Sequence, residues 1–138
     1  MGAVTAIFNQ ALFRRKDHLI TGLVLDSPFA SLKKLALEKI TDKTGLPDFL
    51  VTPILSFLDS ELEERAGFEI DDITPIDHIR KIKIPCIFIS GVRDTLVPPH
   101  HVKLLHKHYT GKKKLMMINA GHNDPRPKKV VEDVLTWL

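Results

Sequence analysis

Two polar side chains stand out because each directly follows an apolar, strand-like run. Asp94 lies in Gly91-Val-Arg-Asp-Thr-Leu-Val-Pro-Pro-His100, and His122 lies in Ala120-Gly-His-Asn-Asp124. A carboxylate can hold a histidine in one tautomer and stabilise its cation, while the second ring nitrogen activates a hydroxyl. An acid after one strand and a histidine after the next is the order found in the later part of a Ser…Asp…His relay. The pair therefore predicts an acid and a general base that act together.

The nucleophile of such a relay is missing from the sequence. No Gly-x-Ser-x-Gly motif, the sharp turn that presents a reactive serine, occurs in the 138 residues. Ser27 and Ser90 border predicted strands, but neither has the flanking glycines that this turn needs. Without a nucleophilic hydroxyl, the pair can move protons but cannot form an acyl-enzyme.

A metal or thiol site is not expected. His100, His101, His106 and His108 fall within one predicted helix, but none has the i, i+4 spacing of a His-x-x-x-His ligand pair. They are interpreted as a solvated, partly amphipathic helix face. The single cysteine, Cys86, lies inside an apolar strand and is interpreted as a buried structural thiol. The sequence therefore predicts neither a metal nor another cofactor.

Hydrophobic spacing predicts alternating helices and strands around these residues. The helices are expected over 2–15, 30–40, 98–109 and 130–138, and the strands over 19–25, 84–90 and 115–118. This order predicts an α/β fold in which a parallel sheet with right-handed crossovers is flanked by helices. The first strand is expected to be buried on both faces. Gly111 is expected to stop the third helix.

The segment 41–72 departs from this regular pattern. It contains Pro47 and Pro53, an apolar cluster and an acidic patch, and it is predicted to form one or two short helices. One interpretation is that its apolar residues simply pack against the sheet.

The three predicted strands all end in polar residues, namely Asp26-Ser27, Arg93-Asp94 and His122-Asn123. In open parallel sheets, binding and catalysis collect beyond the carboxyl ends of the strands. One crossover separates Asp94 from His122, so their loops are expected to lie side by side.

The composition fits one globular domain, with 43% apolar residues, 27% charged residues and a net charge of +3. Basic clusters occur at Arg14-Arg15-Lys16, at Lys112-Lys113-Lys114 and at Arg126 with Lys128-Lys129. They are interpreted as solvated surface, so no nucleic-acid partner is expected, and peripheral contact with an anionic membrane is the weaker alternative. No secretory signal or spanning segment is visible, so a cytoplasmic location is expected unless a targeting segment precedes Met1.

Three segments together resemble the carboxy-terminal half of an α/β-hydrolase. They are Leu25-Asp-Ser-Pro-Phe-Ala-Ser31, the stretch 85–100, and Asn119-Ala-Gly-His122. The nearest group is the serine-aminopeptidase-like set, with the Bem46-like and acyl-protein thioesterase-like intracellular hydrolases. The resemblance implies that Asp94 is the catalytic acid and His122 the catalytic base. It also implies that the segment 41–72 is a lid or cap over the site, an expectation of equal weight to simple packing against the sheet.

The beginning of the chain fits the same resemblance. In that family the nucleophile turn commonly reads Gly-x-Ser-Met-Gly-Ala, and Met1-Gly2-Ala3 matches its last three positions. The serine would then precede Met1 directly, and Met1 would be the remnant of one oxyanion-hole donor. The resemblance also implies that an amino-terminal half of the domain is a missing partner of residues 1–138.

The leading hypothesis is a serine hydrolase that acts on an ester, thioester or amide, here as an inert partial domain. A small-molecule or acyl substrate would bind beside Asp26, Ser27, Leu96 and Val97. A non-catalytic binding or interaction module derived from such a hydrolase is the alternative. A nucleotide-binding domain is disfavoured, because no Gly-x-Gly-x-x-Gly or Walker-type loop follows a strand.

Overall fold

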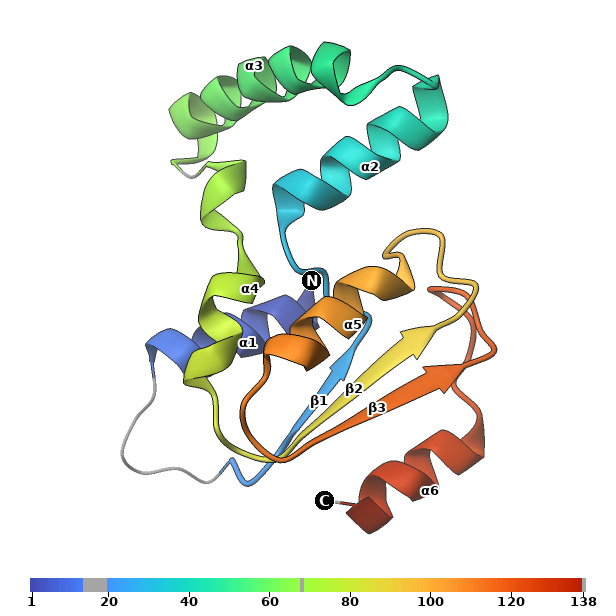
Figure 1. The fold of residues 1–138 in the computed structure, drawn as a ribbon. Helices are drawn as coiled ribbons and strands as arrows, with labels where there is room; N and C mark the ends of the chain where they lie inside the picture. The colour runs from blue at the N-terminus through green and yellow to red at the C-terminus, as the bar shows by residue number, and fades with distance from the viewer. Residues whose placement is uncertain (14–19, 68, 138) are drawn as a thin grey trace. The chain divides into compact units, whose positions relative to one another are not determined.

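The computed structural model describes residues 1–13, 20–67 and 69–137 (Figure 1). The chain divides into two compact units. One comprises Met1–Phe29 and Pro75–Leu138, and it contains the sheet and both members of the acid–histidine pair. The other comprises Ala30–Thr74. It contains α2 (Leu32–Thr44), α3 (Asp48–Ala66) and the short 3₁₀ helix η1 (Ile70–Asp72).

The sheet of the first unit has three parallel strands in the order β1-β2-β3. They are β1 (Leu23–Asp26), β2 (Cys86–Gly91) and β3 (Lys113–Ile118). In the register of the ladder, Leu25 lies beside Phe88, and Phe88 lies beside Leu115. The predicted fold class, a parallel sheet with flanking helices, is confirmed.

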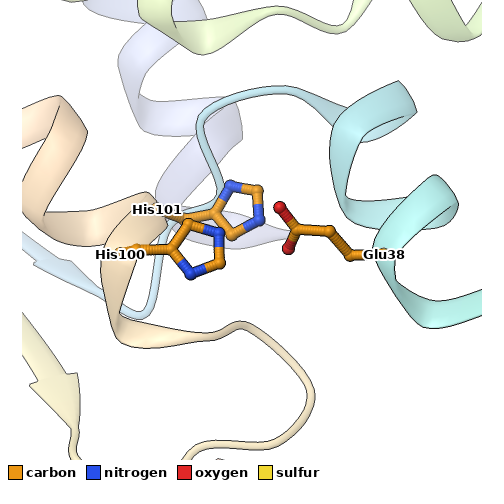
Figure 2. Close-up of side chains that lie close together, drawn as sticks. All are labelled: Glu38, His100 and His101. Carbon is orange, nitrogen blue, oxygen red and sulfur yellow. The ribbon is translucent and has the colours of Figure 1, made fainter. Parts of the chain in front are cut away.

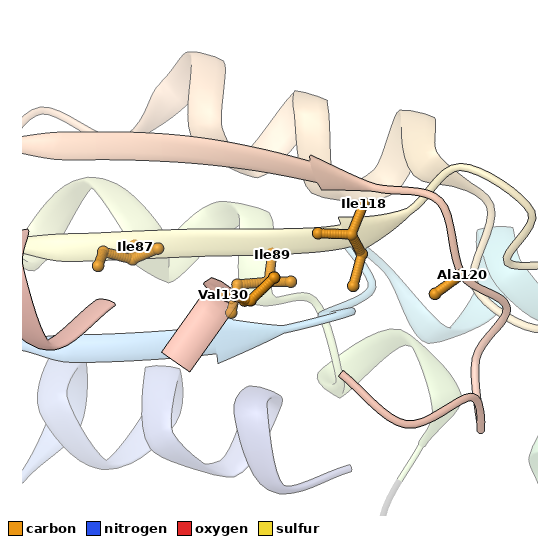
Figure 3. Close-up of a cluster of buried hydrophobic side chains, with 5 residues drawn as sticks. All are labelled: Ile87, Ile89, Ile118, Ala120 and Val130. Carbon is orange, nitrogen blue, oxygen red and sulfur yellow. The ribbon is translucent and has the colours of Figure 1, made fainter. Parts of the chain in front are cut away.

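Helices cover both faces of this sheet (Figure 1). One face carries α1 (Gly2–Leu12) and α5 (Pro99–His108), with α4 (Pro75–His78) and the 3₁₀ helix η2 (Ile79–Lys81) beside them. The other face is covered by α6 (Lys128–Trp137), where Val130 packs against Ile87, Ile89, Ile118 and Ala120 (Figure 3). Alternate positions of β2 and β3 thus supply two separate apolar layers.

The first strand is shorter and less buried than its apolar run predicts. It begins at Leu23, and Val24 is 42% exposed, so the prediction of burial on both faces is wrong. Leu23 and Leu25 point to the face that α1 covers, whereas Val24 points to the other face, beyond the residues that α6 packs against. Residue 19, and the Arg14-Arg15-Lys16 cluster at the predicted end of the first helix, lie outside the described residues.

The segment 41–72 is more regular than predicted, because α2 extends to Thr44 and α3 has 19 residues. The prediction of one or two short helices is therefore wrong. Pro53 lies inside α3, where its missing N–H removes one backbone hydrogen bond without ending the helix, and Gly67 ends the helix in the left-handed conformation. No helix in the described part of the chain is long and apolar enough to cross a membrane. The lid role of this segment stays a prediction.

The residue at which α5 ends also differs from the prediction. The helix ends at His108, and Tyr109 follows in extended conformation, so Gly111 is not its stop. At this end of the helix, Nζ of Lys113 donates to the carbonyl oxygens of His106 at 2.7 Å and Tyr109 at 2.8 Å. Gly111 is required for another reason, since a Cβ at this position would lie 2.6 Å from the carbonyl oxygen of Lys83.

Candidate active site

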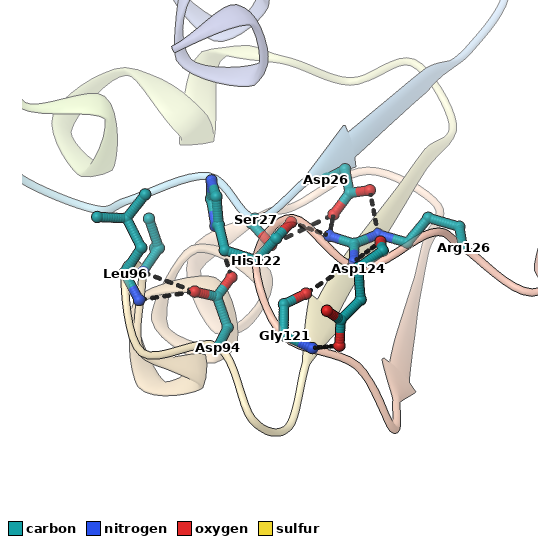
Figure 4. A network of polar contacts seen from close by, with 9 residues as sticks. Asp26, Ser27, Asp94, Leu96, Gly121, His122, Asp124 and Arg126 are labelled. Carbon is teal, nitrogen blue, oxygen red and sulfur yellow. Dashed lines mark hydrogen bonds and ion pairs between the residues drawn. The ribbon is translucent and has the colours of Figure 1, made fainter.

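Asp94 and His122 are hydrogen-bonded to each other beyond the carboxyl ends of β2 and β3 (Figure 4). Nδ1 of His122 lies 2.8 Å from Oδ2 of Asp94. An ionised carboxylate only accepts hydrogen bonds, so Nδ1 carries the proton and a neutral ring has its lone pair on Nε2. The imidazole is 29% exposed. The two residues thus form a unit that can accept a proton at Nε2.

The carboxylate of Asp94 is fixed by its own turn. Its Oδ1 accepts the backbone N–H groups of Leu96 at 3.0 Å and Val97 at 2.8 Å, and its side chain has no exposed surface. Burial by itself raises the pKa of Asp94. The hydrogen bonds from the Val97 N–H, from His122 and from Ser27 together outweigh burial, so the pKa lies below its ordinary value. Asp94 is therefore held as a carboxylate.

Leu96 and Val97, predicted to border a substrate pocket, contribute to the site through their backbone. Val97 is buried, whereas the side chain of Leu96 is 51% exposed. An exposed side chain can contact a substrate directly and a buried one cannot, so the structure favours Leu96 over Val97 as a substrate contact. Their contact with a substrate stays a prediction.

Close approach of two backbone segments brings the acid and histidine loops together. A Cβ on Gly91 would lie 2.2 Å from the carbonyl oxygen of Ala120, so only glycine fits there. The N–H of Val92 donates to Ile118 at 2.8 Å, and that of Arg93 donates to Ala120 at 3.1 Å. The parallel pairing thereby continues past the strand ends and sets the spacing between the two loops.

Ser27 follows β1 in an uncommon conformation. Its φ is 48°, in the left-handed region, and the residue is buried. Its hydroxyl donates to Oδ1 of Asp26 at 3.2 Å, and the same hydroxyl lowers the pKa of the nearby Asp94. The hydroxyl of Ser90 lies within β2 and has no partner among the described residues. Both hydroxyls are enclosed, in keeping with the interpretation that neither is the nucleophile.

Met1, the predicted remnant of an oxyanion-hole donor, precedes the first helix directly. It is the N-cap residue of α1, and its carbonyl oxygen accepts the N–H groups of Val4 at 2.9 Å and Thr5 at 3.1 Å. The side chain is exposed. A helix that begins at Gly2 fits a strand–turn–helix nucleophile turn, and the oxyanion role stays a prediction.

Arg126 is the residue at this site that sequence reasoning missed. Its guanidinium binds Asp26 through Nε at 2.8 Å and Nη2 at 3.0 Å (Figure 4). The interpretation of Arg126 as solvated surface is therefore wrong. Lys112 is also engaged, with Nζ lying 4.5 Å from the centre of the Trp137 ring. The partners Asp26 and Arg126 are 100 residues apart, and no local pattern signals such a pair.

The histidines of α5 pack more closely than a solvated face would. The rings of His100 and His101 are stacked with centroids 4.5 Å apart, and His101 is buried (Figure 2). His106 meets the ring of Phe88 edge-on at 5.6 Å. The solvated interpretation is therefore wrong for His101.

The interpretation of Cys86 as a buried structural thiol is confirmed. It has no exposed surface, and burial raises the pKa of its thiol to about 12. A thiol with such a pKa is almost entirely protonated at neutral pH, so Cys86 is a poor nucleophile.

Known proteins are similar to this chain in sequence or in fold. Uncharacterized protein YqkD of Bacillus subtilis (strain 168) is 27% identical over 126 residues, which span 89% of this chain and 39% of that protein. The structure of the Pyrococcus furiosus esterase Pf2001 has a TM-score of 0.65 at 28% identity over 100% of this chain and 49% of the esterase. Acetyl xylan esterase 1 from Thermoanaerobacterium sp. JW/SL YS485 has a TM-score of 0.62 at 18% identity, and covers 96% of this chain and 41% of its own length.

This chain thus spans less than half the length of these three proteins. The family model described as "Serine hydrolase (FSH1)" matches residues 64–134, a stretch that includes both Asp94 and His122. That stretch is just over half of the 138 residues. Because the family model matches more than half of the chain, the chain belongs to the serine hydrolase (FSH1) family.

Proposed function

We propose that this chain supplies the acid and base of a hydrolase that cleaves an ester through a serine acyl-enzyme. The observation that carries the proposal is the 2.8 Å bond between Nδ1 of His122 and Oδ2 of Asp94. It joins loops that follow neighbouring parallel strands, the place where such sheets assemble active sites. His122 is the general base and then the general acid, and Asp94 orients it.

The chemistry needs a serine in addition to the described pair. The serine oxygen attacks the acyl carbon while its proton passes to Nε2 of His122, giving a tetrahedral intermediate. This intermediate collapses when Nε2 returns the proton to the leaving oxygen, and a water then releases the acid by the same two steps. We propose that this serine directly precedes Met1 in the complete enzyme, because Met1-Gly2-Ala3 matches the last three positions of the family's nucleophile turn.

An ester is the favoured substrate among ester, thioester and amide. The support is the 28% identity and TM-score of 0.65 with the esterase Pf2001. Residues near the pair such as the exposed Leu96 would contact the acyl or alcohol portion. Rates of hydrolysis for matched p-nitrophenyl ester, thioester and anilide substrates rank the three classes directly.

A serine-reactive fluorophosphonate tests the proposal. The 138-residue chain should remain unlabelled, whereas the protein extended by its upstream coding sequence should be labelled once per chain. In the extended protein, His122→Asn should lower kcat for ester hydrolysis by about 10⁶-fold. Stoichiometric labelling of the 138 residues alone, or full activity of the His122→Asn variant, would contradict it.

A second candidate is an interaction module that binds the amino-terminal half of a hydrolase domain. An apolar groove between α1 and β1 favours it, with Ala6, Ile20 and Leu23 among its lining residues. Within the described residues β1 pairs with β2 alone, so one edge of this strand is open. A monodisperse, cooperatively melting monomer that gains a partner only on addition of that half would support this function. Failure of the two to associate would exclude it.

A further inference from the structure

The guanidinium of Arg126 uses all five of its N–H donors at the histidine loop. Two of them, on Nε and Nη2, donate hydrogen bonds to the carboxylate of Asp26. The other three reach backbone carbonyl oxygens of one turn: Nη1 donates to Gly121 at 2.9 Å and to Asp124 at 3.0 Å, and Nη2 donates to His122 at 3.2 Å (Figure 4). One planar group therefore fixes both a carboxylate and the turn that carries the histidine.

The other end of this clamp is itself anchored in the sheet. Asp26 is the last residue of β1, and the next residue, Ser27, donates its N–H to the carbonyl oxygen of Ile89 at 2.9 Å. The hydrogen bonds to Asp26 raise the pKa of Arg126 above its ordinary value. Arg126 thus remains charged, and its bidentate pairing with Asp26 is the strong, geometrically specific kind.

We propose that Arg126 and Asp26 are positioning residues that clamp the 121–126 turn to the end of β1, so that Nδ1 of His122 faces Asp94. The clamp acts on the backbone of His122, since one of its bonds ends on the carbonyl oxygen of that residue. Its catalytic meaning rests on the proposed function, whereas its geometric effect can be measured in the chain alone. Lysine cannot replace it, because one ammonium cannot grip a carboxylate and three carbonyl groups with the planar fork of arginine.

The direct readout is the Nδ1–H proton of His122, measured by NMR in the 138-residue chain with ¹⁵N-histidine labelling. His122→Gln assigns the resonance by removing it. Arg126→Lys keeps the charge, and we expect it to accelerate exchange of this proton with water at least tenfold at temperatures where the chain stays folded. Lys128→Arg, the reverse exchange at an exposed position two residues away, is the matched control and should leave the exchange rate unchanged.

Circular dichroism melts separate positioning from general stability. A lower melting temperature with an unchanged Nδ1–H exchange rate in Arg126→Lys would overturn the proposal, as would absence of the resonance from the unsubstituted chain. Should Arg126→Lys fail to fold, the same exchange rate is measured in Asp26→Asn. This variant removes the charge and one carboxylate oxygen of Asp26 while keeping the arginine. Loss of the fold in both variants would also overturn it, since the pair would then be a general stability element.

The proposed function is tested by a different measurement. Fluorophosphonate labelling and ester hydrolysis report on the serine chemistry, whereas the Nδ1–H signal requires no turnover. In an active extended protein, Arg126→Lys should lower kcat by about 100-fold, because displacement of a catalytic group by about 1 Å costs that much. The value of KM should change far less, since Arg126 touches the histidine turn and not the substrate.

Discussion

Replacement of Gly91 by alanine should separate Asp94 from His122 by a predictable amount. Gly91 ends β2, three residues before the acid, and its Cα faces the carbonyl oxygen of Ala120, two residues before the histidine. The glycine does not adopt a positive φ, so alanine adds no backbone strain of its own. The effect of the substitution is therefore purely steric.

The size of the displacement follows from the contact that the new methyl group would make. A Cβ at residue 91 would lie 2.2 Å from the Ala120 oxygen, and real Cβ contacts stay above 3.0 Å, so the two segments must separate by about 0.8 Å. The same movement added to the 2.8 Å bond of the acid–histidine pair gives about 3.6 Å, which is too long for a hydrogen bond. Overpacking of this kind costs about 1–3 kcal/mol.

Two measurements on the same samples test this reasoning. The melting temperature of Gly91→Ala should fall by roughly 3 to 12 °C, and the exchange-protected Nδ1–H resonance of His122 should disappear. Gly111→Ala is the matched control, because its Cβ would lie 2.6 Å from the carbonyl oxygen of Lys83, beside the opposite ends of β2 and β3. It should lower the melting temperature while leaving the resonance intact. A Gly91→Ala variant that retains the resonance, or a Gly111→Ala variant that loses it, would refute the steric coupling.

Two further predictions concern titration. Folding lowers the pKa of Asp94, so its ionised carboxylate stabilises the folded chain at pH values above the ordinary pKa of 3.8. This stabilisation is lost as the pH falls through the lower pKa of the folded state. Urea unfolding should therefore find Asp94→Asn less stable than the unsubstituted chain at pH 7, with a gap that shrinks below about pH 4; a gap that widens in acid would be inconsistent. Burial raises the pKa of Cys86 to about 12, so iodoacetamide at pH 8 should modify it only after urea unfolds the chain, and rapid alkylation of folded protein would contradict this.

The acid–histidine pair was predictable because two local patterns and one topological rule suffice to find it. Asp94 and His122 each follow a recognisable strand, and adjacent parallel strands bring their carboxyl ends to one edge. The structure places their side chains in direct contact. The catalytic roles of Asp94 and His122 stay a prediction.

Other features depend on information that a local pattern does not carry. Nothing near Asp26 or Arg126 in sequence indicates that they pair across 100 residues. Val24 belongs to an apolar run, yet its exposure is decided by where α6 ends its contact with the sheet. The length of α3 was missed because Pro53 argues against a helix interior, yet the helix continues through it.

The two members of the pair are therefore held by contacts of very different range. Asp94 is fixed by N–H groups two and three residues away, which form as soon as its own turn forms. His122 is fixed through Arg126, whose partner Asp26 lies at the end of a different strand. Changes that detach β1 from the sheet should consequently misplace the histidine while leaving the acid in its turn. The histidine loop thus depends on an intact β1, whereas the backbone bonds that hold the carboxylate of Asp94 form within its own turn.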